Sequence, residues 1–135
     1  MPVMQETAVA FEAKTGKTFE DTVEQCRQAL AKEGFGVLTE IDVQATLKKK
    51  LDVDREPYVI LGACHPPSAH RALTASPEVG VLLPCNVCVS VEGGQTVVRA
   101  MNPESAMSLL KNPEVEKVAA EVAAALRRVV QAVTA

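Results

Sequence analysis

Residues 87–100 read Val87-Cys88-Val89-Ser90-Val91-Glu92-Gly93-Gly94-Gln95-Thr96-Val97-Val98-Arg99-Ala100. Two runs rich in β-branched residues flank a pair of glycines. Paired glycines tolerate the positive φ angles of a tight turn, so this stretch predicts a β-hairpin. Its two strands are expected to be adjacent and antiparallel, and they form the starting point for the rest of the sheet.

Strand patterns also occur on the N-terminal side of this hairpin. Apolar residues alternate or run without interruption over residues 3–13, 36–41, 58–63 and 81–92. The run at 58–63 has no polar interruption, which predicts a central strand covered on both faces. Pro84 lies inside the last of these strands and cannot donate a ladder hydrogen bond, so it marks an edge, a bulge or a bend.

Helices are predicted between and after these strands. Thr18 is the expected N-cap of a first helix that Gly34 ends, and its inward stripe is Phe19, Val23, Cys26 and Leu30. Asp42 caps a short helix that carries Val43, Leu47 and Leu51 on one face, and residues 68–75 form a third helix. Cys26 is therefore expected to be a core residue.

The last predicted helix begins at Asn112-Pro113 and is the longest. Its apolar stripe continues for about six turns by the 3.6-residue repeat. A second, small-residue face is available to another subunit, and it consists of Ala120, Ala123 and Ala124.

Length and composition narrow the class of protein. At 135 residues, positions 1–135 are expected to form a single domain. The start of the chain lacks a basic region followed by an apolar one, and no apolar run approaches the roughly 18 residues of a spanning helix. We therefore expect a soluble, cytoplasmic protein with no membrane partner, in which the 4 cysteines are thiols.

The charge pattern argues against nucleic-acid binding. There are 14 Lys and Arg against 17 Asp and Glu, a net charge of −3. The basic residues are scattered except for Lys48-Lys49-Lys50, which is expected on the solvated face of the short helix. With no Trp, 1 Tyr and 3 Phe, the chain also lacks the aromatic residues of a base-stacking platform.

Residues capable of chemistry meet predicted strands at two places. Cys64 and His65 end one apolar run, Ser68 begins the helix after it, and Cys85 and Asn86 follow Pro84. A thiol near a helix N-terminus has a lowered pKa, and a neighbouring imidazole can serve as base or ligand. These five residues are the candidate ligand-binding site. The competing interpretation is that both cysteines are core residues, because free cysteine is among the most buried residue types.

Other motifs give weaker signals. Cys85 and Cys88 have the spacing of a zinc or dithiol motif, but side chains three apart on a strand point to opposite faces. His65 and His70 fit no recognisable metal spacing. A phosphate loop is also disfavoured, because Pro66 and Pro67 remove two of the backbone N–H groups that an anion would need.

Five segments of the chain resemble a known family. They read GVLTEIDV at residues 36–43, ATLK at 45–48, YVILGAC at 58–64, PPSAHRAL at 66–73 and LLPCNV at 82–87. In this order they resemble the family called domain of unknown function 302, from about Gly16 to the final helix. The resemblance implies an α+β domain with a curved, mainly antiparallel sheet of about five strands packed against helices. It further implies a TATA-binding-protein-like arrangement, often as a homodimer, and no established activity.

One residue departs from the family pattern. His65 stands where the family has asparagine, so a role that needs an imidazole there is not a family trait. Cys64 and Cys85 match the pattern, whereas Cys88 lies outside it.

Three hypotheses follow for the function. The first is a small-ligand or metal-binding domain with a pocket near Cys64 and Cys85. The second is a homodimeric protein-interaction module without a cofactor. The third is a thiol or sulfur-handling enzyme. A nucleophile can be proposed for it, but no base, orienting partner or oxyanion donors. The sequence leaves open whether the protein is an enzyme and names no cofactor or metal.

Overall fold

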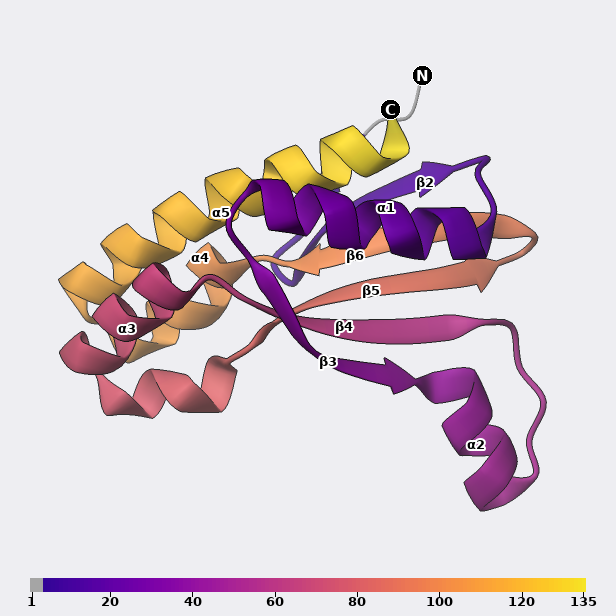
Figure 1. Cartoon of the computed structure of the whole chain (residues 1–135). Coiled ribbons are helices and arrows are strands. Elements are labelled where there is room, and N and C mark those ends of the chain that lie inside the picture. Colours follow the sequence, from indigo (N-terminus) through magenta and orange to yellow (C-terminus); the bar gives the residue numbers. More distant parts are fainter. Residues whose placement is uncertain (1–3) are drawn as a thin grey trace.

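The hairpin at Gly93-Gly94 lies in the middle of the sheet (Figure 1). A computed structural model describes residues 4–135, in which β5 (Cys85–Glu92) and β6 (Gln95–Met101) are antiparallel neighbours. Gly93 and Gly94 have φ angles of 59° and 81°, the left-handed conformation that such a turn requires. The hairpin prediction is therefore confirmed.

The described residues form an antiparallel sheet of six strands in the order β1-β2-β6-β5-β4-β3. The remaining strands are β1 (Gln5–Glu6), β2 (Ala10–Thr15), β3 (Gly36–Asp42) and β4 (Tyr58–Cys64). Strand β4 is internal, between β3 and β5, as predicted. The α+β fold class is confirmed, but the sheet has six strands rather than about five.

The extra strand arises because the first predicted strand is two. Residues 3–13 were expected to form one extended segment, but the chain turns at Thr7 and returns as β2. The Thr7 hydroxyl accepts the N–H groups of Val9 and Ala10, which tightens the turn and leaves Val9 exposed. Asn102 supports the turn by donating its side-chain amide to the Thr7 carbonyl. Val3 lies outside the described residues.

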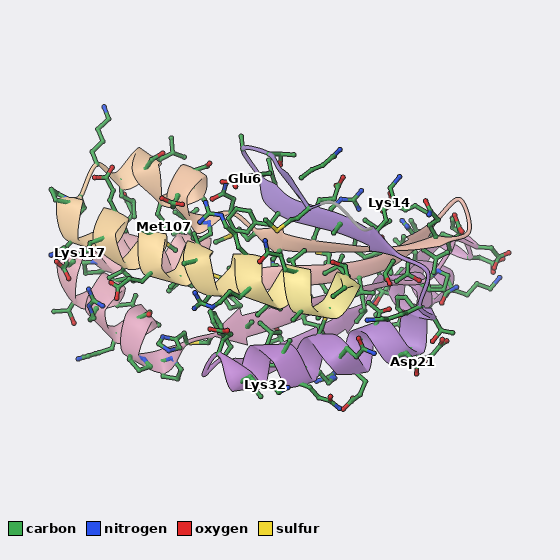
Figure 2. All side chains as sticks on the ribbon, turned by 90° about the horizontal axis from the view of Figure 1, so that it is seen from above. Glu6, Lys14, Asp21, Lys32, Met107 and Lys117 are labelled. Carbon is green, nitrogen blue, oxygen red and sulfur yellow. The ribbon has the colours of Figure 1, made fainter. Side chains whose placement is uncertain are left out.

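Helices α1 (Phe19–Lys32) and α5 (Pro113–Thr134) lie side by side on one face of the sheet. Figure 2 looks down on this layer, with Asp21 near one end of α1 and Lys32 near the other. Thr18 caps α1 through the Asp21 N–H, and Asn112 caps α5. Both helices begin where the sequence predicted, and Cys26 is a core residue as expected.

The core lies between this helix layer and the inner face of the sheet. The strands contribute mainly small β-branched residues and alanine, and α5 contributes the predicted stripe. Ala123 belongs to this core with 0% exposure, so the small-residue face expected for a second subunit is wrong at that position. Residues three apart on a helix share a face, so Ala123 lies on the same buried face as Leu126. Its neighbour Val122 is buried as well.

The remaining elements lie at the two ends of the molecule (Figure 1). Helix α2 (Val43–Leu51) stands away from the α1–α5 layer at one end. At the other end lie α3 (Pro66–Ala75), the 3₁₀ segment η1 (Pro77–Leu82), α4 (Pro103–Met107) and a short 3₁₀ turn, η2 (Ser108–Leu110). Asp42 caps α2 by accepting the Ala45 N–H, as predicted.

Two details of the predicted strands are wrong. A strand was expected over residues 81–92, but Val81 and Leu82 belong to η1 and β5 begins only at Cys85. Pro84 lacks the N–H that a paired strand needs, so the ladder starts after it. Strand β4 was expected to be covered on both faces, yet Tyr58 and Ile60 are only half-buried, because helices cover a single face.

The face without helices is closed by ion pairs. Arg99 on β6 donates to Glu12 on β2 and to Glu92 on β5, so one guanidinium joins three neighbouring strands. The hydrogen bonds from Arg99, with a further one from Ser90, lower the pKa of Glu92 to about 2. Val97 lies beside this cluster and is fully buried. No helix in the described part of the chain is long and apolar enough to cross a membrane.

Gly62 on β4 has less space for a Cβ atom than any other glycine of the described chain. A Cβ atom there would lie 3.0 Å from Cγ of Pro84 and far too close to Oγ1 of Thr39. We expect Gly62→Ala to destabilise the fold by about 1–3 kcal/mol, the range for overpacking. Chemical denaturation would measure the loss.

Gly36→Ala is the matched control, because a Cβ on this strand glycine meets nothing within 4 Å. Thr39→Ala in the Gly62→Ala background should recover part of the loss, since it removes the nearest clashing atom. Equal stability of the two alanine variants would show that the sheet yields freely at Gly62.

The ion pairs of Arg99 predict that the free energy of unfolding depends on pH in the acidic range. Glu92 has a folded pKa of about 2 against an ordinary value of 4.5. Its contribution is therefore complete above about pH 4.5 and is lost as the pH falls toward 2. Glu92→Gln should flatten the curve of unfolding free energy against pH across this window. Glu78→Gln, which removes an exposed carboxylate from η1, should leave the slope as it is in the wild type.

Candidate functional site

Four of the five candidate residues line one cavity. It lies where the end of β4, the start of β5 and helix α3 meet α5, and its walls include Cys64, His65, Ser68 and Cys85. The volume of the cavity is about 30 Å³. One water needs about 10–15 Å³, so the cavity, whose wall includes the half-buried Cys64 and His65, has room for about two or three waters.

The polar side of the cavity is formed by the loop from β4 into α3. Nδ1 of His65 lies 2.7 Å from Oγ of Ser68, and the His65 ring packs at 5.3 Å from the Phe35 ring. A Cβ at Gly34 would lie 3.1 Å from the same imidazole. These contacts hold His65 between the turn after α1 and the first turn of α3. Ser68 as a residue is 7% exposed, and its hydroxyl pairs with this histidine.

Cys85 forms the inner wall. It is buried at the start of β5, opposite Ala63 on β4. Burial, and after it the charge of the nearby Cys64, raise the pKa of the Cys85 thiol to about 11. At neutral pH Cys85 is therefore a neutral thiol, and a weak nucleophile. Cys64 is half-buried at the end of β4.

Asn86 does not join the other candidates. It follows Cys85 on β5, and the alternation of the strand turns it to the helix-free face, where it lies opposite Gly62 and is exposed. Cys88 also lies on that face. Its pKa is raised by burial, against which a hydrogen bond from Tyr58 acts. Cys85 and Cys88 therefore point to opposite sides of the sheet, as the sequence predicted.

The donor set does not form a metal centre. Within residues 4–135, no three His, Cys, Asp or Glu side chains come together in a way that could hold a metal ion. His70 is exposed on α3 and lies outside the cavity. All four cysteines are free thiols, and burial raises the pKa of Cys26 to about 12.

Sequence reasoning missed part of the cavity wall. Phe35 was not assigned to the site, and Met107 comes from α4, a helix that was not predicted. Val118 and Val122 belong to the predicted stripe of α5, but nothing in their spacing indicates which neighbours they meet. A signal for α4 was present in Asn102-Pro103, since proline is favoured in the first turn of a helix.

Comparison with known proteins identifies the family to which the chain belongs. A crystal structure described as uncharacterized conserved protein DUF302 from Bacillus stearothermophilus matches it with a TM-score of 0.86 and 29% sequence identity, covering 91% of this chain and 96% of that one. No curated protein matches. The model of the family Domain of unknown function DUF302 matches residues 11–133. The chain therefore belongs to the DUF302 family.

Proposed function

We propose that this protein binds a small organic ligand in the cavity between α3, β4, β5 and α5. The observation that carries the proposal is convergence: Cys64, His65 and Ser68 meet Cys85, about twenty residues later in the chain, around one space. Ligand sites commonly combine an apolar cavity with a few polar groups that fix orientation. Metal binding is not part of the proposal, because the described residues offer no donor cluster.

The walls define the chemistry of the ligand. Apolar side chains form most of the lining, and those from α3, α4 and α5 are alanine, valine and methionine, so the body of the ligand is small, uncharged and apolar. The His65–Ser68 pair lies on the polar side of the cavity and can form a hydrogen bond with the ligand. A ligand larger than this space requires α3 to move away from α5, where Arg71 of α3 pairs with Glu114 and Glu121.

Two further expectations belong to this proposal, the first from the family resemblance and the second from the sequence. A TATA-binding-protein-like arrangement is supported by an antiparallel sheet with helices on one face, and a cytoplasmic location by four free thiols. A thiol enzyme is a weaker candidate, because burial raises the pKa of Cys26, Cys85 and Cys88. Cys64 is the thiol on which that alternative rests.

Native mass spectrometry tests the ligand. The protein as purified should carry a discrete mass above that of the denatured chain, and Cys64→Ser with Cys85→Ser should remove it. Cys26→Ser is the matched control, because it places the same hydroxyl in the core of α1, outside the cavity. A wild-type native mass equal to the bare chain or its multiples, or a bound species that persists in the double variant, would contradict the proposal.

Alkylation rates test the enzyme alternative. With iodoacetamide at neutral pH, half-buried Cys64 and Cys88 should react before buried Cys26 and Cys85, because access and thiolate content limit the reaction. Peptide mapping assigns each rate. If Cys64 reacts no faster than free cysteine, the thiol-enzyme alternative is contradicted. A rate at least about tenfold above that of free cysteine would favour the enzyme.

A further inference from the structure

Helix α2 is the one regular helix of the described chain in which no residue is buried. It stands apart from the α1–α5 layer (Figure 1). Val43 and Leu47 are half-buried, and Leu51 is 66% exposed. An isolated helix of fewer than about twelve residues is marginal in water and is normally stabilised by packing one face. The stripe of Val43, Leu47 and Leu51 thus lacks the cover that stabilises such a helix.

A groove lies beside the start of this helix. Its volume is about 270 Å³, and it runs between the first turns of α1 and the adjoining ends of β3, β4 and α2. Phe19 and Val23 give it an apolar floor, and both are half-buried. Its acidic side chains are Glu20, Glu40 and Asp42.

The groove is acidic and the helix end is basic. Arg27 pairs with Glu40, so the groove has more carboxylates than guanidinium groups. The last turn of α2 carries Lys48, Lys49 and Lys50. Asp52 and Asp54 hold Lys48, which leaves the exposed ammonium groups of Lys49 and Lys50 available to a partner. The two surfaces are opposite in charge, and each has an apolar part, Phe19 and Val23 in the groove and the leucines on the helix.

Within one molecule these surfaces cannot meet. The groove contains Asp42 and Gln44 at the start of α2, whereas the lysines and Leu51 lie at the other end of the helix. A nine-residue helix separates its ends by roughly 13 Å at about 1.5 Å per residue. Two such helices packed antiparallel bring the end of each beside the start of the other.

The stripe has the symmetry that such packing needs. Val43, Leu47 and Leu51 recur every four residues, with Leu47 in the middle. In an antiparallel pair centred on Leu47, Val43 of each chain lies opposite the partner's Leu51.

We propose that α2 and the acidic groove form an interface with a second copy of this chain, in which two α2 helices pack antiparallel and the lysines of each enter the groove of the other. The interface is isologous, so each contact occurs twice and the assembly closes at two copies. It lies at the opposite end of the molecule from α3 and the cavity, and it is independent of any ligand bound there.

Charge exchange tests the interface. Sedimentation velocity on the full chain should show a dimer at about 0.15 M salt that weakens at about 0.5 M, since screening reduces attraction between exposed charges. Lys50→Glu and Glu20→Lys should each weaken association by about tenfold or more, by placing like charges together. The double variant, which restores opposite charges across the two-fold axis, should recover the dimer.

A second pair of variants separates this surface from general stickiness. Leu51→Asp should give a monomer with an unchanged circular dichroism spectrum, because the side chain is exposed in the single chain. Leu109→Asp is the matched control, since Leu109 is 78% exposed on η2 near the other end. A monomeric wild type at about 0.1 mM, well above the micromolar dissociation constants of modest interfaces, would overturn the proposal. So would a Leu51→Asp variant that stays dimeric, or a double charge variant that does not recover.

Discussion

The apolar face of α5 against the inner surface of the sheet is the contact around which the domain is organised. Its buried residues recur along the whole 22-residue helix, and α5 packs against β2, β6, α1, α3 and α4. Each fully buried valine or leucine side chain contributes about 1.5–3 kcal/mol relative to an exposed one. The strands bring mainly valine and alanine to this face, and their largest buried side chains are Phe11 and Leu61. The opposite face has no such cover, and the ion pairs of Arg99 with Glu12 and Glu92 lie there.

The cavity follows from the same packing. Alanines on α3 and valines on α5 approach the ends of β4 and β5 without filling the space beside Cys64 and Cys85. Burial keeps Cys85 neutral by raising its pKa, which suits recognition of an uncharged ligand better than nucleophilic attack. His65 is held in place by Phe35 and Ser68, and so provides an oriented polar group at the edge of an otherwise apolar space.

Local patterns predicted much of this architecture. Helix caps and tight turns depend only on residues that are close in the sequence, so a local pattern is enough to predict them. The structure confirms the caps at Thr18, Asp42 and Asn112 and the turn at Gly93-Gly94. The wrong predictions concern segments whose conformation depends on a contact with residues far away in the sequence. The turn at Thr7 is supported by Asn102, ninety-five residues away in the chain. Four members of the candidate site were found because strand ends and helix starts meet in α+β folds. Asn86 was misplaced into the pocket although alternation along β5 turns it to the other face, and Met107 was missed with its helix.

Both edges of the sheet have features that oppose pairing with a further strand. One is formed by β1, which is only two residues long, and the other by β3, whose pairing with β4 is interrupted between Val37 and Thr39. A short edge strand offers few free N–H and C=O groups to another strand. In an irregular edge strand these groups are not in register with those of a regular strand. Acidic Glu40 and Asp42 on β3 further oppose a second copy of the same strand. The sheet is thereby protected from growing strand by strand into a fibre, although Leu38 and Ile41 are exposed on that edge.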